Sequence, residues 1–168
     1  FQEIGCHIVF DIKMDFTRKA RFVAGGHTTE APSSLMYSSV VSRDSIRIAF
    51  LIAALNNIDI MSCDLENAYL NAPCREKIWF QDGLECSKDR GKVCVIVRSL
   101  YGLKSSGASF RNHLADCMKH LQFVPCLADP DLWMKPMTRP SDGFEYYYAY
   151  VLIYVDDVMV VHHDAESV

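Results

Sequence analysis

The feature that most constrains the fold of this chain is an apolar stretch at residues 146–161 that carries two adjacent carboxylates, Asp156 and Asp157. Two adjacent charges in hydrocarbon are so costly that the stretch does not fit a membrane span, and no membrane partner is expected. The apolar, β-branched residues on either side predict two strands, 146–155 and 158–162, joined at the acidic pair. Because a surface hairpin usually alternates polar and apolar residues, this pattern indicates an apolar hairpin with two partly desolvated charges at its tip.

Length and composition are typical of one globular domain. The chain has 168 residues, half of them apolar, which is enough for a domain with a core. It begins with Phe1 inside an expected strand and shows no signal peptide, so we expect a fragment of a longer protein. The seven cysteines form no C-x-x-C pair and their number is odd, which favours free thiols in a reducing compartment over disulfides or a zinc site.

The net charge of −4 is unevenly distributed along the chain. Residues 75–119 hold nine Lys and Arg against five Asp and Glu, whereas residues 120–168 hold two against eight. A basic middle and an acidic end suit a protein that holds phosphates at one place and cations at another. Charge alone nevertheless favours the plainer interpretation, a solvated surface of uneven charge.

Two helices are expected from the apolar periodicity. The first is capped by Asp44 or Ser45, runs to about Leu55 and, being apolar nearly all round, is expected to be buried. The second begins at Ser105 or Ser106. Its inner face is expected to hold apolar residues spaced i, i+4, i+7 and i+11, namely Phe110, Leu114, Cys117 and Leu121.

The other expected elements are short strands. Residues 4–12 and 19–24 predict a hairpin, followed by a loop at 27–39. Further strands are predicted at 58–65, 77–81, 93–97 and 132–134, with a turn or short helix at 66–71. Because helices and strands are mixed without strict alternation, the order favours an α+β fold with an antiparallel sheet over a doubly wound parallel sheet.

Three carboxylates form the candidate catalytic set. Asp64 stands at the end of the predicted strand 58–65, where its side chain can join a site built elsewhere in the sequence, at Asp156 and Asp157. Carboxylate oxygens are hard ligands suited to Mg²⁺ or Mn²⁺, and a two-metal phosphoryl-transfer site needs such a set. Plainer interpretations stay open, since Asp is common in turns and Asp64 could cap the short helix that follows.

Several blocks of the sequence resemble those of reverse transcriptases. The tip of the hairpin, YVDD at 154–157, is similar to the Y-x-D-D motif of these enzymes. Five more blocks, in order, resemble the copia-type retrotransposon group: KARFVA at 19–24, residues 37–43, DLENAYLN at 64–71, SLYGLK at 99–104 and DPDLW at 129–133. The sequence departs from this pattern at Ser39, where Pro is usual, and at 105–107, where Ser-Ser-Gly replaces a Pro-containing stretch that borders the nucleotide site in the family.

The resemblance implies a right-hand polymerase of α+β class, with a palm whose antiparallel sheet packs on helices. It implies that fingers occupy about residues 1–40 and 72–105 and that the palm occupies about residues 41–71 and 106–168. The thumb and ribonuclease H regions that follow in the family are expected to lie outside this partial domain, and a fragment without them is expected to be weakly active or inactive alone.

The resemblance also implies the site residues. Asp64, Asp156 and Asp157 would bind Mg²⁺ or Mn²⁺ as the catalytic carboxylates, with Asp64 and Asp156 holding the ions most directly and Asp157 as a looser, supporting ligand. Six further residues would contact nucleotide or primer. Tyr154 would lie near the primer end, Lys19 and Arg21 would meet the triphosphate, Tyr69 would exclude ribonucleotides as a steric gate, and Tyr101 and Gly102 would border the nucleotide site. For Lys19 and Arg21 a solvated hairpin face is an equal alternative, and Tyr69 could instead be a core tyrosine.

The implied function is RNA-directed DNA synthesis, with deoxynucleotides added to a primer 3′ end on an RNA or DNA template during retrotransposition. The family context implies an intracellular, cytoplasmic location in virus-like particles, and the oligomeric state is left open. Two alternatives stay open. One is an inactive remnant that only binds nucleic acid, although all three carboxylates are present. The other is a nucleotidyl cyclase with a similar palm, which leaves the blocks at 19–24 and 99–104 without a role.

Overall fold

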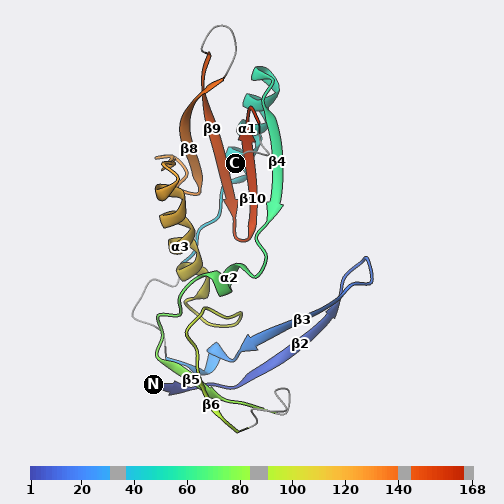
Figure 1. The fold of residues 1–168 in the computed structure, drawn as a ribbon, viewed down its shortest axis with the longest axis vertical. Coiled ribbons are helices and arrows are strands. Elements are labelled where there is room, and N and C mark those ends of the chain that lie inside the picture. The colour runs from blue at the N-terminus through green and yellow to red at the C-terminus, as the bar shows by residue number, and fades with distance from the viewer. Residues whose placement is uncertain (31–36, 84–90, 140–144, 165–168) are drawn as a thin grey trace. The chain divides into compact units, whose positions relative to one another are not determined.

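The computed structural model describes residues 1–30, 37–83, 91–139 and 145–164, so Cys86 and part of the predicted loop at 27–39 lie outside the described residues. The chain divides into two compact units (Figure 1). The first unit comprises Phe1–Ser38 and Asn67–His113, and the second comprises Ser39–Glu66 and Leu114–Val168. No helix in the described ranges is long and apolar enough to cross a membrane.

The first unit contains the predicted hairpin and a small separate sheet. Strands β2 (Cys6–Ile12) and β3 (Arg18–Ala24) pair antiparallel along their whole length, which confirms the hairpin. The sheet has the order β1-β5-β6, with β1 (Gln2–Glu3) parallel to β5 (Ile78–Gln81) and β5 antiparallel to β6 (Val93–Val95). The unit also holds the short helices η1 (Gly26–Thr28) and α2 (Ala68–Asn71) and the start of α3 (Ser106–His120). Its core consists of Ile4, Ala24, Ile78, Ile96 and Leu103.

Close backbone packing joins β3 to the loop that precedes α3. The Ala24 N–H donates to the Tyr101 carbonyl at 2.8 Å. Gly102 has φ +91°, and a Cβ atom on it would overlap the Ala24 carbonyl oxygen. Gly26 meets the same loop, since a Cβ there would overlap the Gly102 carbonyl oxygen. Only glycine fits at these two positions without moving the backbone.

The second unit is built on a five-stranded antiparallel sheet of order β4-β10-β9-β8-β7. The mixture of helices with antiparallel sheets confirms the α+β class. The predicted strand at 132–134 is too short, since β8 runs on to Arg139 against β9, and the short strand β7 was not predicted. The strands are β4 (Asp59–Asp64), β7 (Val124–Pro125), β8 (Leu132–Arg139), β9 (Glu145–Tyr154) and β10 (Asp157–His162).

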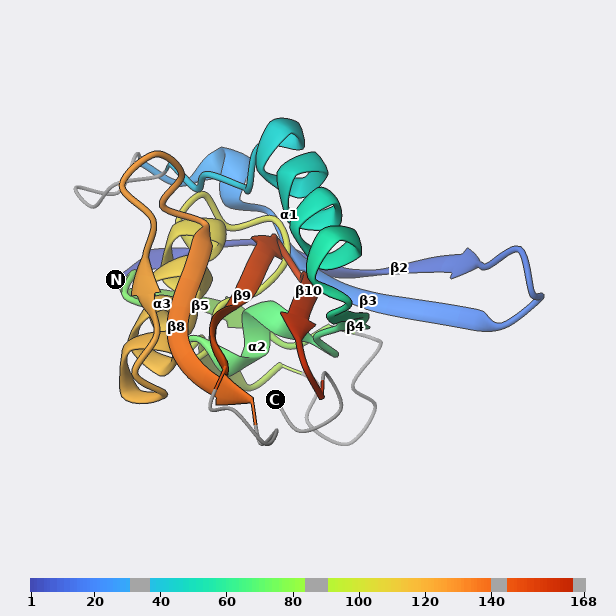
Figure 2. The same ribbon diagram turned by 90° about the horizontal axis from the view of Figure 1, so that it is seen from above.

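Apolar residues lie on both faces of this sheet because a helix covers each face (Figure 2). On one face, Leu152 and Val161 pack against Ala49 and Ala53 of α1 (Arg43–Asn56). On the other face, the neighbouring residues of the same strands pack against the end of α3 and the segment that follows it. That cluster holds Met118, Phe123, Trp133, Ala149, Val151, Ile153, Val158 and Val160. Because successive side chains of a strand point to opposite faces, and both faces are covered, the middle of each hairpin strand is apolar at consecutive positions, as at 151–153 and 158–161.

The prediction that α1 is buried all round is wrong. Its buried residues are two small ones, Ala49 and Ala53, which let the helix approach the sheet closely, and Ile46 packs beside them partly buried. The large apolar side chains on the far side are exposed, with Ile48 at 56%, Leu51 at 58% and Leu55 at 75%. The N-cap is also two or three residues earlier than predicted, at Ser42.

The predicted inner face of α3 is correct only in its first half. Phe110 is buried and Leu114 packs against the core, but the next buried residue is Met118 and not Cys117. Leu121 follows the end of the helix and is 52% exposed. The buried positions 110, 114 and 118 therefore keep a spacing of four residues. The apolar pattern alone could not distinguish position 118 from position 117, because both carry an apolar residue and both spacings occur on one face of a helix.

Candidate active site

The β9–β10 hairpin ends in a turn of two residues. Tyr154 and Asp157 are register partners, so Val155 and Asp156 form the loop and β10 begins at Asp157, one residue earlier than predicted. Val155 has φ +58°. A β-branched residue in this left-handed region is a conformational outlier, because its side chain crowds the backbone there. The acidic pair thus lies on a strained turn that the neighbouring structure must hold in place.

Strand β4 brings Asp64 to the same end of the sheet. Asp64 is the last residue of β4 and lies directly opposite Asp157 in the antiparallel pairing with β10. The next residue, Leu65, donates its N–H to the Asp156 carbonyl at 2.8 Å. Residues directly opposite in an antiparallel pair share a face, with Cβ atoms about 4.5–5.5 Å apart. The strand pairing and this hydrogen bond therefore bring the backbone at Asp64 beside the Asp156–Asp157 turn, although the two segments lie far apart in the sequence.

The carboxylates have little electrostatic compensation from the described part of the chain. Asp64 and Asp157 are exposed and Asp156 is half-buried. None of the three forms an ion pair with a described Lys, Arg or His, and like charges directly opposite one another destabilise a sheet. As the side chains stand, no three described His, Cys, Asp or Glu gather closely enough to hold an ion. The pairing of Asp64 with Asp157 is therefore the observation that supports binding of a divalent cation at this site. Both residues supply hard oxygen donors, and a bound cation would relieve the repulsion between them.

A small cavity of about 210 Å³ lies beside the acidic end of the sheet. Alternation along the strands places Tyr154 and Asp157 on the face of the sheet that carries Leu152, the face covered by α1. The Tyr154 side chain is half-exposed there, at 51%. Most of the cavity wall is apolar; it is lined by Val41, Ile46, Ser62, Leu152, Tyr154, Asp157, Val158 and Met159.

Three of the residues predicted to contact the nucleotide meet in the first unit. The Tyr69 ring lies 4.7 Å from the Tyr101 ring, between centroids, and 6.0 Å from the Phe110 ring. Tyr69 and Tyr101 are both half-buried. Gly102 lets the backbone of its loop approach β3 of the same chain closely. These contacts fix the Tyr69 ring against its neighbours while part of it stays accessible.

Lys19 and Arg21 lie on one face of the β2–β3 hairpin. Arg21 forms an ion pair with Asp11 at 3.5 Å, and Lys19 is the register partner of the same Asp11. Both basic residues are half-buried. They belong to the first unit and the carboxylates to the second, so the use of all of them at one site stays a prediction.

Comparison with known proteins identifies the family. The whole chain, residues 1–168, matches the family model described as reverse transcriptase (RNA-dependent DNA polymerase). The chain is 27% identical over 168 residues to the retrovirus-related Pol polyprotein from transposon TNT 1-94 of Nicotiana tabacum, covering 95% of this chain and 12% of that protein. It is 26% identical over 170 residues to the corresponding polyprotein from transposon RE1 of Arabidopsis thaliana, covering 96% and 11%.

A fungal relative extends the comparison. The chain is 28% identical over 166 residues to the transposon Ty1-GR3 Gag-Pol polyprotein of Saccharomyces cerevisiae, covering 98% of this chain and 9% of that protein. The chain thus spans about a tenth of the length of these relatives. No solved structure matches it. The chain belongs to the reverse transcriptase family, as the reverse transcriptase domain of a copia-type element.

Proposed function

We propose that this domain performs RNA-directed DNA synthesis, adding deoxynucleotides to a primer 3′ end, with Asp64, Asp156 and Asp157 binding two divalent cations, Mg²⁺ or Mn²⁺. The observation that carries the proposal is the register of β4 and β10, which sets Asp64 opposite Asp157 beside the Asp156 turn. The cations would supply charge stabilisation for the attacking and leaving oxygens of the transferred phosphate. The role of the protein is to hold the three carboxylates at one end of a rigid sheet.

The remaining predicted residues have complementary roles in this proposal. Tyr154, on the sheet face of Asp157, would support the primer end. Tyr69, held by Tyr101 and Phe110, would lie beneath the sugar of the incoming nucleotide and exclude a 2′-hydroxyl. Gly102 would set the path of the loop before α3, which carries Tyr101, through its close contact with β3. The basic side chains Lys19 and Arg21 would meet the triphosphate.

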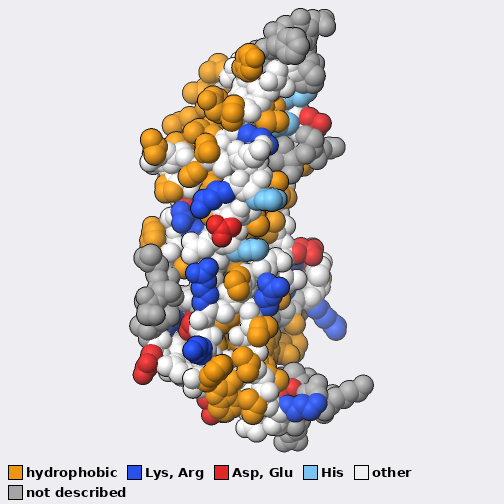
Figure 3. All heavy atoms as spheres, turned by 60° about the vertical axis from the view of Figure 1, so that its left-hand side comes forward, with side chains coloured by type: hydrophobic (Ala, Val, Ile, Leu, Met, Phe, Trp, Pro, Cys, Tyr) orange, Lys and Arg blue, Asp and Glu red, His pale blue; other side chains and the backbone are white. Residues whose placement is uncertain are grey.

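The partners of the proposed enzyme are a primer annealed to RNA or DNA template and the four deoxynucleoside triphosphates. Lys and Arg side chains are interspersed among apolar ones on the surface (Figure 3), and such cations contact the phosphates of nucleic acids. We assign the first unit to the fingers and the second to the palm. The domain would act in the cytoplasm, within the particles of the element.

The test is templated synthesis by a full-length polymerase that carries this domain. Asp156→Asn should abolish Mg²⁺-dependent extension of a primer on an RNA template, because an amide cannot replace a charged ligand. Asp59→Asn is the matched control, since Asp59 is exposed at the opposite end of β4 and should extend normally. Normal extension by Asp156→Asn would refute the assignment. A wild-type protein that binds primer–template but never extends it would indicate the nucleic-acid-binding remnant instead.

A further inference from the structure

A buried carboxylate outside the candidate active site accepts several hydrogen bonds. Asp129, which is only 8% exposed, lies in the segment between β7 and β8. Its Oδ2 accepts from the Ser42 N–H at 2.9 Å and from the Ser45 hydroxyl at 2.6 Å. Its Oδ1 accepts from the Asp131 N–H at 3.2 Å. Asp129 thereby ties the start of α1 to the start of β8, two segments about 85 residues apart in the chain.

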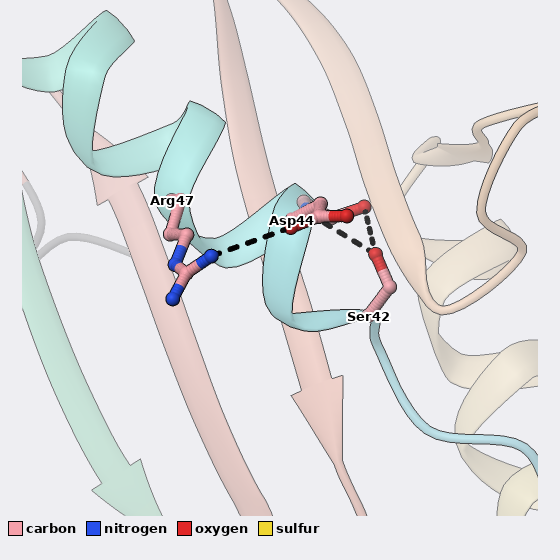
Figure 4. A network of polar contacts seen from close by, with 4 residues as sticks. Ser42, Asp44 and Arg47 are labelled. Carbon is pink, nitrogen blue, oxygen red and sulfur yellow. Dashed lines mark hydrogen bonds and ion pairs between the residues drawn. The ribbon is translucent and has the colours of Figure 1, made fainter.

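The start of α1 is itself organised around the same serines (Figure 4). The Ser42 side chain caps the helix by accepting from the Ser45 N–H at 3.1 Å, and its hydroxyl donates to the Ser45 hydroxyl at 2.9 Å. A second carboxylate on this turn, Asp44, is exposed and forms an ion pair with Arg47 at 3.7 Å on the surface. The two acids at this helix terminus therefore differ: Asp129 is buried within the fold and Asp44 faces solvent.

The two segments that Asp129 joins also hold the last part of β9 in place. The Val41 N–H, next to Ser42, donates to the Ile153 carbonyl at 2.9 Å. The Ile153 N–H donates to the Asp131 carbonyl at 3.0 Å. Ile153 immediately precedes Tyr154 and the turn that carries Asp156 and Asp157. Both backbone polar groups of Ile153 are thus bound by segments that Asp129 joins.

We propose that Asp129 is a positioning residue for the proposed polymerase site, holding the β9 end through Val41 and Asp131 so that the Asp156–Asp157 turn keeps its place opposite Asp64. The inference rests on the proposed function of these carboxylates. Two features make such support necessary. Val155 holds an unfavourable left-handed conformation, and the acidic residues repel one another; both persist only where surrounding contacts fix the backbone.

The charge state of Asp129 suits this role. Burial alone would raise the pKa of Asp129, but the hydrogen bonds from Ser45, Ser42 and Asp131 outweigh burial and lower the pKa below its ordinary value. The side chain is therefore an ionised acceptor at neutral pH, and hydrogen bonds to ionised groups are about twice as strong as neutral ones.

The experiment measures single-turnover nucleotide incorporation by a full-length polymerase carrying this domain. Asp129→Asn puts an amide N–H₂ where backbone and hydroxyl donors now point, and Ser45→Ala removes one hydrogen bond. Both should lower the maximal rate, on the order of 10–100-fold as expected for small misplacements of catalytic groups. The Mg²⁺ concentration at half-maximal rate should rise, while primer–template affinity stays unchanged. Ser45→Thr, which keeps the hydroxyl, and Asp44→Asn should match the wild type.

The outcomes separate this inference from the proposed function. A wild-type rate and Mg²⁺ dependence for Ser45→Ala and for a folded Asp129→Asn would overturn the inference, provided that Asp156→Asn is inactive. If Asp156→Asn extends primers normally, the proposed function itself fails. If Asp129→Asn does not fold, the rate and Mg²⁺ dependence of Ser45→Ala alone decide whether the inference holds. Equal losses of rate in Ser45→Ala and Asp44→Asn would also overturn the specific role of Asp129.

Discussion

Replacing Gly102 with alanine should destabilise the first unit strongly. Gly102 has φ +91°, a conformation that costs an L-residue roughly 1–2 kcal/mol. The added Cβ would also overlap the Ala24 carbonyl oxygen, which is backbone of a paired strand and cannot turn away as a side chain would. Forcing extra volume into a packed site costs typically about 1–3 kcal/mol. Together these effects give a loss of roughly 2–5 kcal/mol in the free energy of unfolding.

The assay is urea unfolding followed by tryptophan fluorescence. The chain has two tryptophans, Trp79 in the first unit and Trp133 in the second, so a Trp133→Phe background leaves Trp79 as the reporter of the first unit. The matched control is Gly5→Ala, since a Cβ on Gly5 meets nothing within 4 Å. It should change stability little. Equal stability of Gly102→Ala and Gly5→Ala would refute the packing of this loop on β3.

Asp129→Asn should lower the free energy of unfolding by about 1.5–3 kcal/mol at neutral pH. Because folding lowers the pKa of Asp129, the difference in stability between wild type and variant should be fully present above the ordinary Asp pKa and should shrink as the pH falls through the lowered pKa, as measured by denaturation at a series of pH values. Tyr69→Val should reduce the discrimination between deoxy- and ribonucleotides, measured as the ratio of kcat/KM values, by about tenfold for every ~1.4 kcal/mol of steric rejection removed; an unchanged ratio would leave Tyr69 as a packing residue. Ala53→Leu should destabilise the second unit by about 1–3 kcal/mol in urea unfolding because Ala53 is packed against the sheet. Leu51 is exposed, so Leu51→Ala should change the free energy of unfolding by no more than about 0.5 kcal/mol. A larger loss for Leu51→Ala than for Ala53→Leu would contradict the orientation of α1.

The hairpin could be predicted from the sequence because it is a local signal, although its turn lies at Val155 and Asp156, one residue earlier than predicted. An apolar run interrupted by two acids can hardly form anything but two strands and a turn. Asp64 is a candidate ligand because it ends another apolar strand. The register that sets Asp64 opposite Asp157 was not predictable from either segment, since it depends on pairing across the sheet.

Features that depend on tertiary packing could not be predicted from the sequence. Helix α1 is apolar on all sides, and hydrophobicity alone favours burying Leu51 and Leu55; the structure instead uses Ala49 and Ala53, because small residues let the helix lie close to the sheet. The same holds for α3, where two spacings of apolar residues were compatible with the sequence. A β-branched residue at the left-handed position of Val155 runs against local preference.

The burial and the hydrogen bonds of Asp129 could not be predicted either, although the block at 129–133 stands out in the sequence. The sequence showed an acid followed by Pro in that block, which alone indicates a turn. Only the fold brings Ser42 and Ser45 to the carboxylate and reveals it as a buried acceptor. A signal was present in the sequence, but its partners lay about 85 residues away.

If Asp64, Asp156 and Asp157 form one divalent-cation site, as proposed, each of them contributes to the binding of Mn²⁺. Electron paramagnetic resonance counts the Mn²⁺ ions bound by a full-length polymerase with a dideoxy-terminated primer–template and an incoming nucleotide. Asp64→Asn should weaken this binding strongly even though Asp64 lies far from the acidic pair in the sequence, and Asp59→Asn on the same strand should leave it unchanged. Equal Mn²⁺ binding by the wild type and Asp64→Asn would contradict the account.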